Sequence, residues 1–209
     1  MINKDLQNYI ETKVFPEYSK NEQGHGIKHI EYVVRRSLNF AKEVENLNLD
    51  MVYVIASYHD IGHHINAKQH EKVSADIFTK DENMKNFFTE DEIKIISEAI
   101  QDHRASGERE PRTIYGKIVS SADRRTDIED ILIATYNYSS KHNKELTLEE
   151  NIEEAYKHVC NKFSIGGYAT KKIYFKDEEF DSLINKVQWL KNNKQEFVKY
   201  YCKINGINL

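Results

Sequence analysis

The chain contains few of the residues that interrupt helices, with only two prolines and eight glycines among 209 residues. Runs in which apolar and polar residues alternate, the pattern typical of strands, are also scarce. Because glycine and proline mark the turns of β-rich folds, their scarcity argues against an all-β architecture. The sequence therefore predicts an all-α fold, a compact bundle of several helices with a C-terminal packing helix.

Cysteine, long apolar runs and excess positive charge are equally limited. Cys160 and Cys202 lie far apart and form no CxxC pair, so we expect two buried thiols in a reducing compartment. No run approaches the roughly 18 apolar residues of a membrane span, and the N-terminus lacks the apolar stretch of a signal peptide. The net charge of −4 provides no basic field for a nucleic acid duplex. We therefore expect a cytoplasmic protein that binds neither nucleic acid duplexes nor membranes.

What the chain does contain fits one globular domain, since 39% of its residues are hydrophobic and 31% charged. The apolar spacing predicts helices over residues 4–17, 27–45, 50–58, 67–78, 90–103, 114–123, 128–138, 148–163 and 178–201. Asp50 is the expected N-cap of the third helix, and Thr89 or Glu90 begins the fifth. Residues 105–112 are expected to form an exposed loop.

The segment His59-Asp60-Ile61-Gly62-His63-His64 follows the apolar run over residues 52–58. Neighbouring residues on a helix diverge by about 100°, so His59 and Asp60 can face the same point only where the helix ends. Gly62 would then allow the chain to turn. With other segments supplying further ligands, Asp60 could bridge two metal ions through its two oxygens.

Other histidines and an aspartate occur at suitable places. His29, His59, Asp60 and Asp123 lie on three predicted helices, and a set of imidazoles and carboxylates suits a hydrolytic divalent or trivalent metal. Alone, His29 would more often be a structural histidine, and Asp123 could pair with a neighbouring arginine. As a set, these four residues favour a metal site. His70 and His103 are candidates for a second metal.

The order His29, His59-Asp60, Asp123 resembles the signature of the HD superfamily of metal-dependent phosphohydrolases, from about His25 to Arg125. The resemblance implies an HD-domain bundle over residues 1–209, with a metal-site core at 25–125 and a helical extension at 126–209. It also implies that the four residues bind a first metal. The chain lacks the Gly-Tyr-Pro extension of the cyclic-dinucleotide phosphodiesterases. It most resembles small bacterial HD hydrolases of unassigned substrate.

The same resemblance implies two additional ligands, because His70 and His103 look like the extra histidines of members that hold a second metal. One or two metal ions per chain are expected, and iron, manganese, zinc, nickel, cobalt and magnesium are not distinguished. Asp60 and one of His63 and His64 are the catalytic candidates, the histidine acting as a general acid or a phosphate contact. The candidate substrate-binding residues are His25, Arg104, Arg109, Arg112 and Arg124, although a solvated loop is an equal alternative for the arginines of the 104–112 segment.

These residues predict hydrolysis of a phosphate ester or anhydride in a nucleotide-like small molecule, by water activated on the metal. One alternative is an iron-dependent HD-type oxygenase, which would require oxygen for turnover. Another is a metal- or nucleotide-binding sensor that does not turn over. The sequence does not specify the substrate or the native metal, and it leaves a homodimer open.

Overall fold

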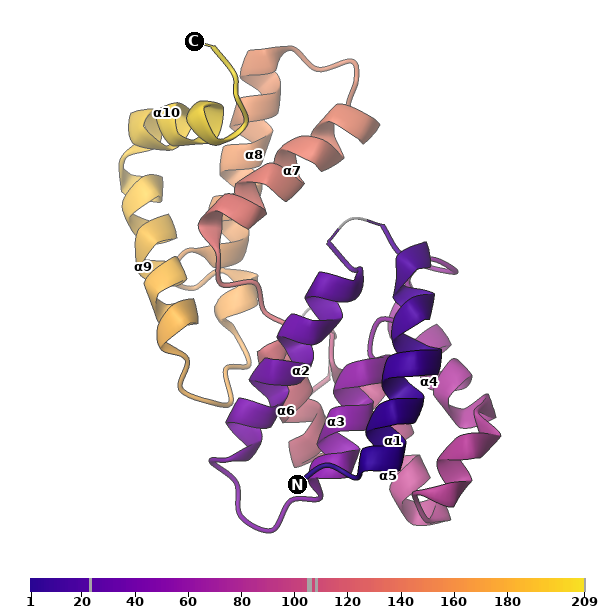
Figure 1. Cartoon of the computed structure of the whole chain (residues 1–209). Helices are drawn as coiled ribbons and strands as arrows, with labels where there is room; N and C mark the ends of the chain where they lie inside the picture. Colours follow the sequence, from indigo (N-terminus) through magenta and orange to yellow (C-terminus); the bar gives the residue numbers. More distant parts are fainter. Residues whose placement is uncertain (23, 105–106, 108, 209) are drawn as a thin grey trace. The chain divides into compact units, whose positions relative to one another are not determined.

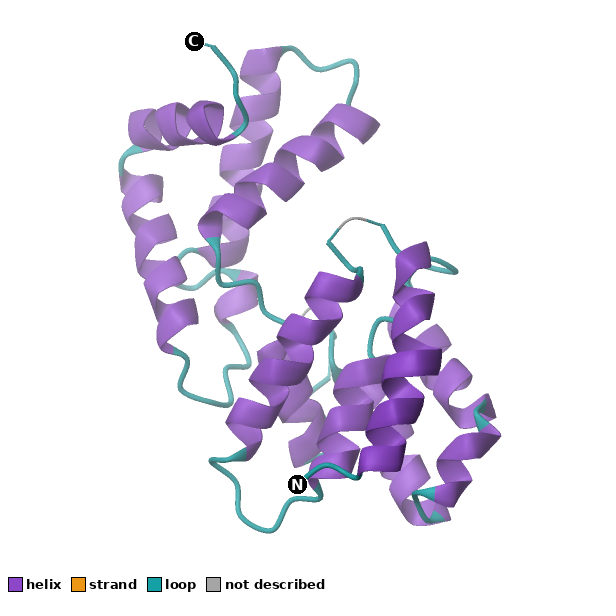
Figure 2. Ribbon diagram, viewed as in Figure 1, coloured by secondary structure: helices purple, strands orange, loops and turns teal. Residues whose placement is uncertain are grey.

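The computed structural model describes residues 1–22, 24–104, 107 and 109–208. All regular structure in these ranges is helical, with ten α-helices, three 3-10 helices, one π-helical turn and no strand. Figure 1 and Figure 2 show these helices and the loops that join them. The predicted all-α fold is therefore confirmed. The chain packs as two units, Met1–Asp123 and Arg124–Leu209. That residues 1–209 act as one domain stays a prediction.

The first unit carries six α-helices. They are α1 (Lys4–Tyr9), α2 (Ile27–Ala41), α3 (Leu49–Tyr58), α4 (His70–Lys80), α5 (Glu90–Asp102) and α6 (Ile114–Ala122). After α1 the chain continues as a π-helical turn (Ile10–Val14) and a 3-10 helix (Phe15–Lys20), because Pro16 is tolerated in the first turn of a helix. A second 3-10 helix (Glu82–Asn86) joins α4 to α5.

Helix α3 lies at the centre of this unit, packed against α2, α5 and α6. All its residues from Met51 to Tyr58 are buried, as expected for an apolar helix surrounded by others. Its N-cap is Asn48, whose side-chain oxygen accepts the backbone N–H of Asp50. The prediction that Asp50 is the cap is therefore wrong. Helix α5 begins at Glu90, one of its two predicted starts, with Thr89 as its N-cap and Glu92 completing a capping box.

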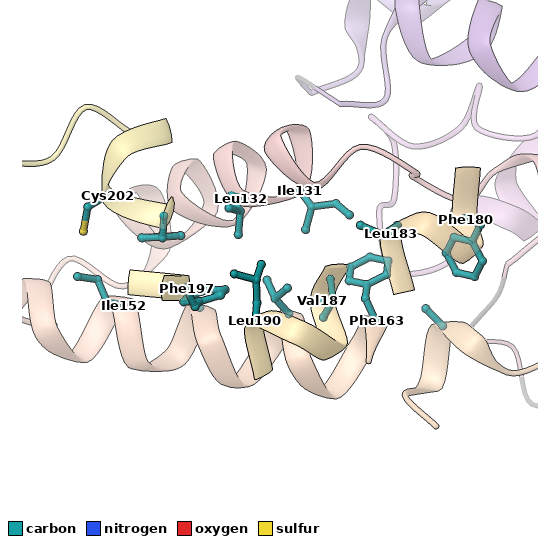
Figure 3. Packing of buried hydrophobic residues seen from close by; sticks show 14 residues of the cluster. Ile131, Leu132, Ile152, Phe163, Phe180, Leu183, Val187, Leu190, Phe197 and Cys202 are labelled. Atoms are coloured by element: carbon teal, nitrogen blue, oxygen red, sulfur yellow. The ribbon is translucent and has the colours of Figure 1, made fainter. Parts of the chain in front are cut away.

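The second unit contains α7 (Ile128–His142), α8 (Leu148–Phe163), α9 (Glu178–Asn192) and α10 (Lys194–Ile204), with a short 3-10 turn at Tyr168–Thr170. The predicted packing helix over residues 178–201 is wrong as one element, because Asn193 leaves the helical region at φ −130° and ψ 65°. Its apolar stripe is nevertheless buried, and α9 and α10 both contribute to the core in Figure 3.

Two expectations from composition also hold in the described ranges. Cys160 and Cys202 are both buried free thiols. Among the helices described, none is both long enough and apolar enough to cross a bilayer.

Candidate metal centre

All six candidate metal ligands belong to the first unit, and five of them lie at helix ends or next to one. His29 lies in the first turn of α2, His59 follows α3 directly and precedes Asp60, His70 begins α4, His103 follows α5 and Asp123 follows α6. At these positions a side chain can turn away from its own helix, so different helices can present ligands to one point. The six side chains form two groups, and Asp60 approaches both of them, with one carboxylate oxygen toward each.

The first group joins α2, α3 and α6. His29 Nε2 lies 3.1 Å from Asp123 Oδ1 and 3.3 Å from His59 Nε2. Asp60 Oδ2 lies 3.6 Å from both of these imidazole nitrogens. Two imidazoles and two carboxylates thus direct ligand atoms at a common region, in the mixture of nitrogen and oxygen that catalytic metals use.

The second group uses the other oxygen of the same aspartate. Asp60 Oδ1 lies 3.2 Å from His70 Nε2 and 3.6 Å from His103 Nε2, and these two nitrogens are 3.2 Å apart. All three residues are buried. Asp60 Oδ1 has no hydrogen-bond partner, which is costly for a buried carboxylate oxygen. A cation between Asp60, His70 and His103 would satisfy it.

The backbone fixes the tautomers of three of these histidines. The Nδ1 atoms of His59, His70 and His103 each lie within hydrogen-bond distance of the carbonyl oxygen three residues earlier, in Ala56 (2.8 Å), Ala67 (3.0 Å) and Ile100 (2.6 Å). A carbonyl only accepts, so each Nδ1 carries the proton and each neutral ring presents a lone pair at Nε2. The Nε2 lone pairs of neutral His70 and His103 face each other at 3.2 Å and repel, which a shared proton or a metal ion would relieve. The donor set therefore fits a metal.

The electrostatics of the first group favour a positive charge there. Although burial opposes protonation, the adjacent Asp60 and Asp123 raise the pKa of His59 to about 9. Burial likewise opposes ionisation of Asp60, yet His59 and the other imidazoles hold the pKa of its carboxyl well below the usual range. In the second group, burial and then His103 lower the pKa of His70. Asp60 and Asp123 thus favour a positive charge beside His59, which a bound cation would supply in place of the proton.

Two polar residues that the sequence analysis did not single out hold the Asp60 backbone. The fully buried Tyr18 donates its hydroxyl to the carbonyl of Ser57 (2.9 Å) and accepts the N–H of Asp60 (3.3 Å). Asn21 donates its side-chain amide to the carbonyl of Asp60 (2.9 Å). Both residues lie in or just after the 3-10 helix Phe15–Lys20, far from the ligands in sequence. No local pattern relates them to the site.

Of the remaining histidines near the turn, His25 and His63 stack on each other beside Asp60, whereas His64 bonds to Asn21. His25 Nδ1 donates to Asp60 Oδ2 (2.6 Å), and its ring stacks on that of His63 with centroids 3.9 Å apart. The side chain of His25 is 33% exposed, so this edge of the centre is open to solvent. Burial, and then the neighbouring His25, lower the pKa of His63 to about 4. His64 is exposed and its Nδ1 bonds to Asn21 instead.

The arginines of the predicted phosphate-binding loop contact protein groups. Arg104 donates to the carbonyl of Lys68 (2.7 Å) and lies 3.5 Å from Glu71. Arg109 and Arg112 both donate to the carboxylate of Asp102, at 3.1 Å and 2.9 Å. Of the predicted exposed loop, residues 105, 106 and 108 lie outside the described residues.

A buried carboxylate such as Asp102 needs this compensation, because an unpaired charge in the interior is strongly destabilising. Arg124 belongs to the second unit, where its guanidinium donates to the carbonyls of Ala169, Lys171 and Lys172. Phosphate binding by the four arginines stays a prediction, but each of them already has a protein acceptor.

Comparison with known proteins gives a family and a fold. The model of the HD domain family matches residues 26–127. A predicted HD superfamily hydrolase from an uncultured Thermotogales bacterium is 17% identical, over 95% of this chain and 92% of that one, with a TM-score of 0.51. A protein from Lactobacillus plantarum is 18% identical, over 99% and 100% of the two chains, with a TM-score of 0.59. No curated protein matches the chain.

Proposed function

We propose that the chain, whose residues 26–127 match the HD domain family, is a metal-dependent phosphohydrolase of that family. Its substrate would be a phosphate ester or anhydride, in a small molecule of nucleotide type. The observation that carries the proposal is the division of the Asp60 carboxylate, since one oxygen faces His29 and His59 and the other faces His70 and His103. A carboxylate shared in this way suits two ions that act on one substrate.

His29, His59, Asp60 and Asp123 would hold the first ion, and Asp60, His70 and His103 the second. Bound metal supplies a Lewis acid that polarises a phosphoryl oxygen and lowers the pKa of coordinated water. The chain's own part is to orient the ligands so that their Nε2 atoms face the ion. The carbonyl bonds at Nδ1 of three of the histidines do this, because they leave each Nε2 available.

His25 and His63 are the residues we propose to meet the substrate. They form a stacked pair beside Asp60 at the open edge of the centre. The Nδ1 atom of His63 is buried without a hydrogen-bond partner, so a phosphoryl oxygen or a leaving oxygen would satisfy it. His64 is turned to Asn21, and we therefore assign the catalytic role left open between the two histidines to His63.

The test is product release by protein reloaded with single metals. Manganese, iron, cobalt, nickel, zinc and magnesium would each be supplied to metal-free protein, with nucleoside mono-, di- and triphosphates and phosphodiesters as substrates. Asp60→Asn should lower kcat by about a thousandfold or more, because it removes the carboxylate shared by both groups. The matched control is Asp76→Asn, an exposed carboxylate on α4.

Three results would contradict the proposal. Full turnover by Asp60→Asn would show that the activity does not depend on the metal centre. A product formed only with iron and oxygen would identify oxidative chemistry. Nucleotide binding without product across the whole panel would identify a sensor.

A further inference from the structure

Asn21 makes an unusual number of side-chain hydrogen bonds for a residue in a surface loop. It ends the 3-10 helix Phe15–Lys20 and is only partly buried. Its amide nitrogen donates to the carbonyls of His25 and Asp60, both at 2.9 Å. Its side-chain oxygen accepts the backbone N–H of His64 at 3.0 Å and the ring Nδ1–H of the same residue at 3.1 Å. Both hydrogens of the amide and both lone pairs of the oxygen are thus used.

These four bonds join two segments that both bring residues to the metal centre. His25 precedes α2, whereas Asp60 and His64 belong to the turn that follows α3. Because one amide nitrogen holds the carbonyls of His25 and Asp60, it fixes the distance between the two backbones. The side-chain bond between His25 Nδ1 and Asp60 Oδ2, at 2.6 Å, depends on that distance.

The same bonds decide which of two adjacent histidines faces the centre. His63 and His64 follow each other in a tight turn, so their rings point in different directions. Asn21 holds the backbone and the ring of His64 on the outside. His63 then lies inside, stacked on His25 at 3.9 Å and 5.3 Å from the ring of His70.

We propose that Asn21 is a positioning residue, which orients the turn after α3 so that His63 faces the metal centre and His25 stays on Asp60. The proposal deepens the proposed function, on which its relevance to catalysis rests. Asn21 touches neither ligand atoms nor reacting atoms. It acts through the orientation of His25, Asp60 and His63.

The chain offers a matched control at the other end of α3. Asn48 also uses its side chain for two bonds, accepting the N–H of Asp50 (3.0 Å) and donating to Glu92 (3.1 Å). It caps the start of α3, the helix that His59 follows. Asn48→Ala should therefore lower stability about as much as Asn21→Ala, without releasing the turn.

The experiment compares full-length Asn21→Ala, Asn21→Asp and Asn48→Ala with wild type. The first readout is the rate at which diethyl pyrocarbonate modifies His63 and His64 in metal-free protein, measured for each residue by mass spectrometry. The second is Mn²⁺ affinity by calorimetry. Neither readout requires turnover, so a failure of the proposed function in wild type leaves this test intact.

In wild type we expect the exposed His64 to react faster than His63. Asn21→Ala should raise the His63 rate about tenfold, because the turn loses four hydrogen bonds. Asn21→Asp keeps an oxygen acceptor for His64 but loses both donated bonds. It should leave the His64 rate near that of wild type while Mn²⁺ binding weakens about tenfold.

Asn48→Ala should leave both readouts within about twofold of wild type. The proposal is overturned if Asn21→Ala and Asn48→Ala change the two readouts alike, since Asn21 would then contribute only stability. It is also overturned if His63 reacts at the wild-type rate in Asn21→Ala.

Discussion

Asp60 Oδ1 and His70 Nε2 lie 3.2 Å apart, and the carboxylate that provides this oxygen turns its other oxygen toward His29 and His59. Asp60 therefore approaches both ligand groups, whereas His70 approaches Asp60 only through the oxygen of the second group. A change at Asp60 would affect every bound ion. A change at His70 would affect only an ion bound by the second group.

His70→Ala should remove one metal ion and spare the other. Elemental analysis of anaerobically purified protein should find about two ions per chain in wild type and about one in the variant, because the second group keeps only Asp60 and His103. His142→Ala, in the other unit, is the control and should match wild type. About one ion in wild type and in His70→Ala would instead return His70 to the substrate pocket and leave the four-ligand site standing.

Gly62→Ala should destabilise the first unit. A Cβ at this position would lie 2.7 Å from Val73 Cγ1 and 2.9 Å from the backbone nitrogen of Ser74, both on α4. Backbone cannot yield as a flexible side chain does, so we expect a loss of about 1–3 kcal/mol in the free energy of unfolding. Denaturant titration of metal-free protein measures it. A variant as stable as wild type would show that α4 moves away at little cost.

The double variant Gly62→Ala with Val73→Ala tests the steric cause. Removing the Val73 methyl groups makes room for part of the new Cβ, so the two changes together should cost less than the sum of the single changes. Strict additivity would point to a cause other than the contact with α4.

Asp81→Asn should change how stability depends on pH. Burial opposes ionisation of Asp81, but hydrogen bonds from Tyr58 (2.5 Å), Asn83 and Tyr9 (2.8 Å) hold the pKa of its carboxyl below the usual value. A carboxyl with a lowered folded pKa stabilises the fold above its unfolded pKa of about 4, and this contribution is lost as the pH falls through the folded pKa. The free energy of unfolding of wild type should therefore exceed that of Asp81→Asn by about 1 kcal/mol at pH 7. The difference should be smaller below pH 4.

Denaturant titrations between pH 3 and pH 7 measure this difference. Asp76→Asn, on the exposed side of α4, serves as the control. A difference between wild type and Asp81→Asn that stays constant with pH would mean that the carboxyl charge contributes nothing.

The metal centre could be anticipated because its signals are local. An apolar helix ending in His59-Asp60 indicates where two ligands can turn to one point, and the structure brings the other four candidates to that turn. Metal ligation by these residues stays a prediction, as do the substrate roles. The sequence explains Gly62 by the backbone freedom that a turn needs. In the structure a glycine is required there because Val73 and Ser74 of α4 leave too little room for a Cβ.

What could not be anticipated depends on tertiary contacts. The sequence offers the loop arginines as phosphate ligands, whereas in the structure Arg109 and Arg112 donate to Asp102, a residue that no motif distinguishes. Asn21 bonds to residues 39 and 43 positions away, a spacing that no local pattern encodes. Asn193 carries nothing that marks it as a break, since asparagine is only moderately unfavourable in helices.

The orientation of His59, His70 and His103 has an evolutionary consequence. Their rings are held by carbonyl oxygens of positions 56, 67 and 100, and every amino acid supplies a backbone carbonyl. Mutation at those three positions can change the side chain but cannot delete the acceptor. As far as the orientation of these histidines is concerned, the side chains at positions 56, 67 and 100 are therefore free to diverge, and the orienting partners would leave no trace of conservation in an alignment.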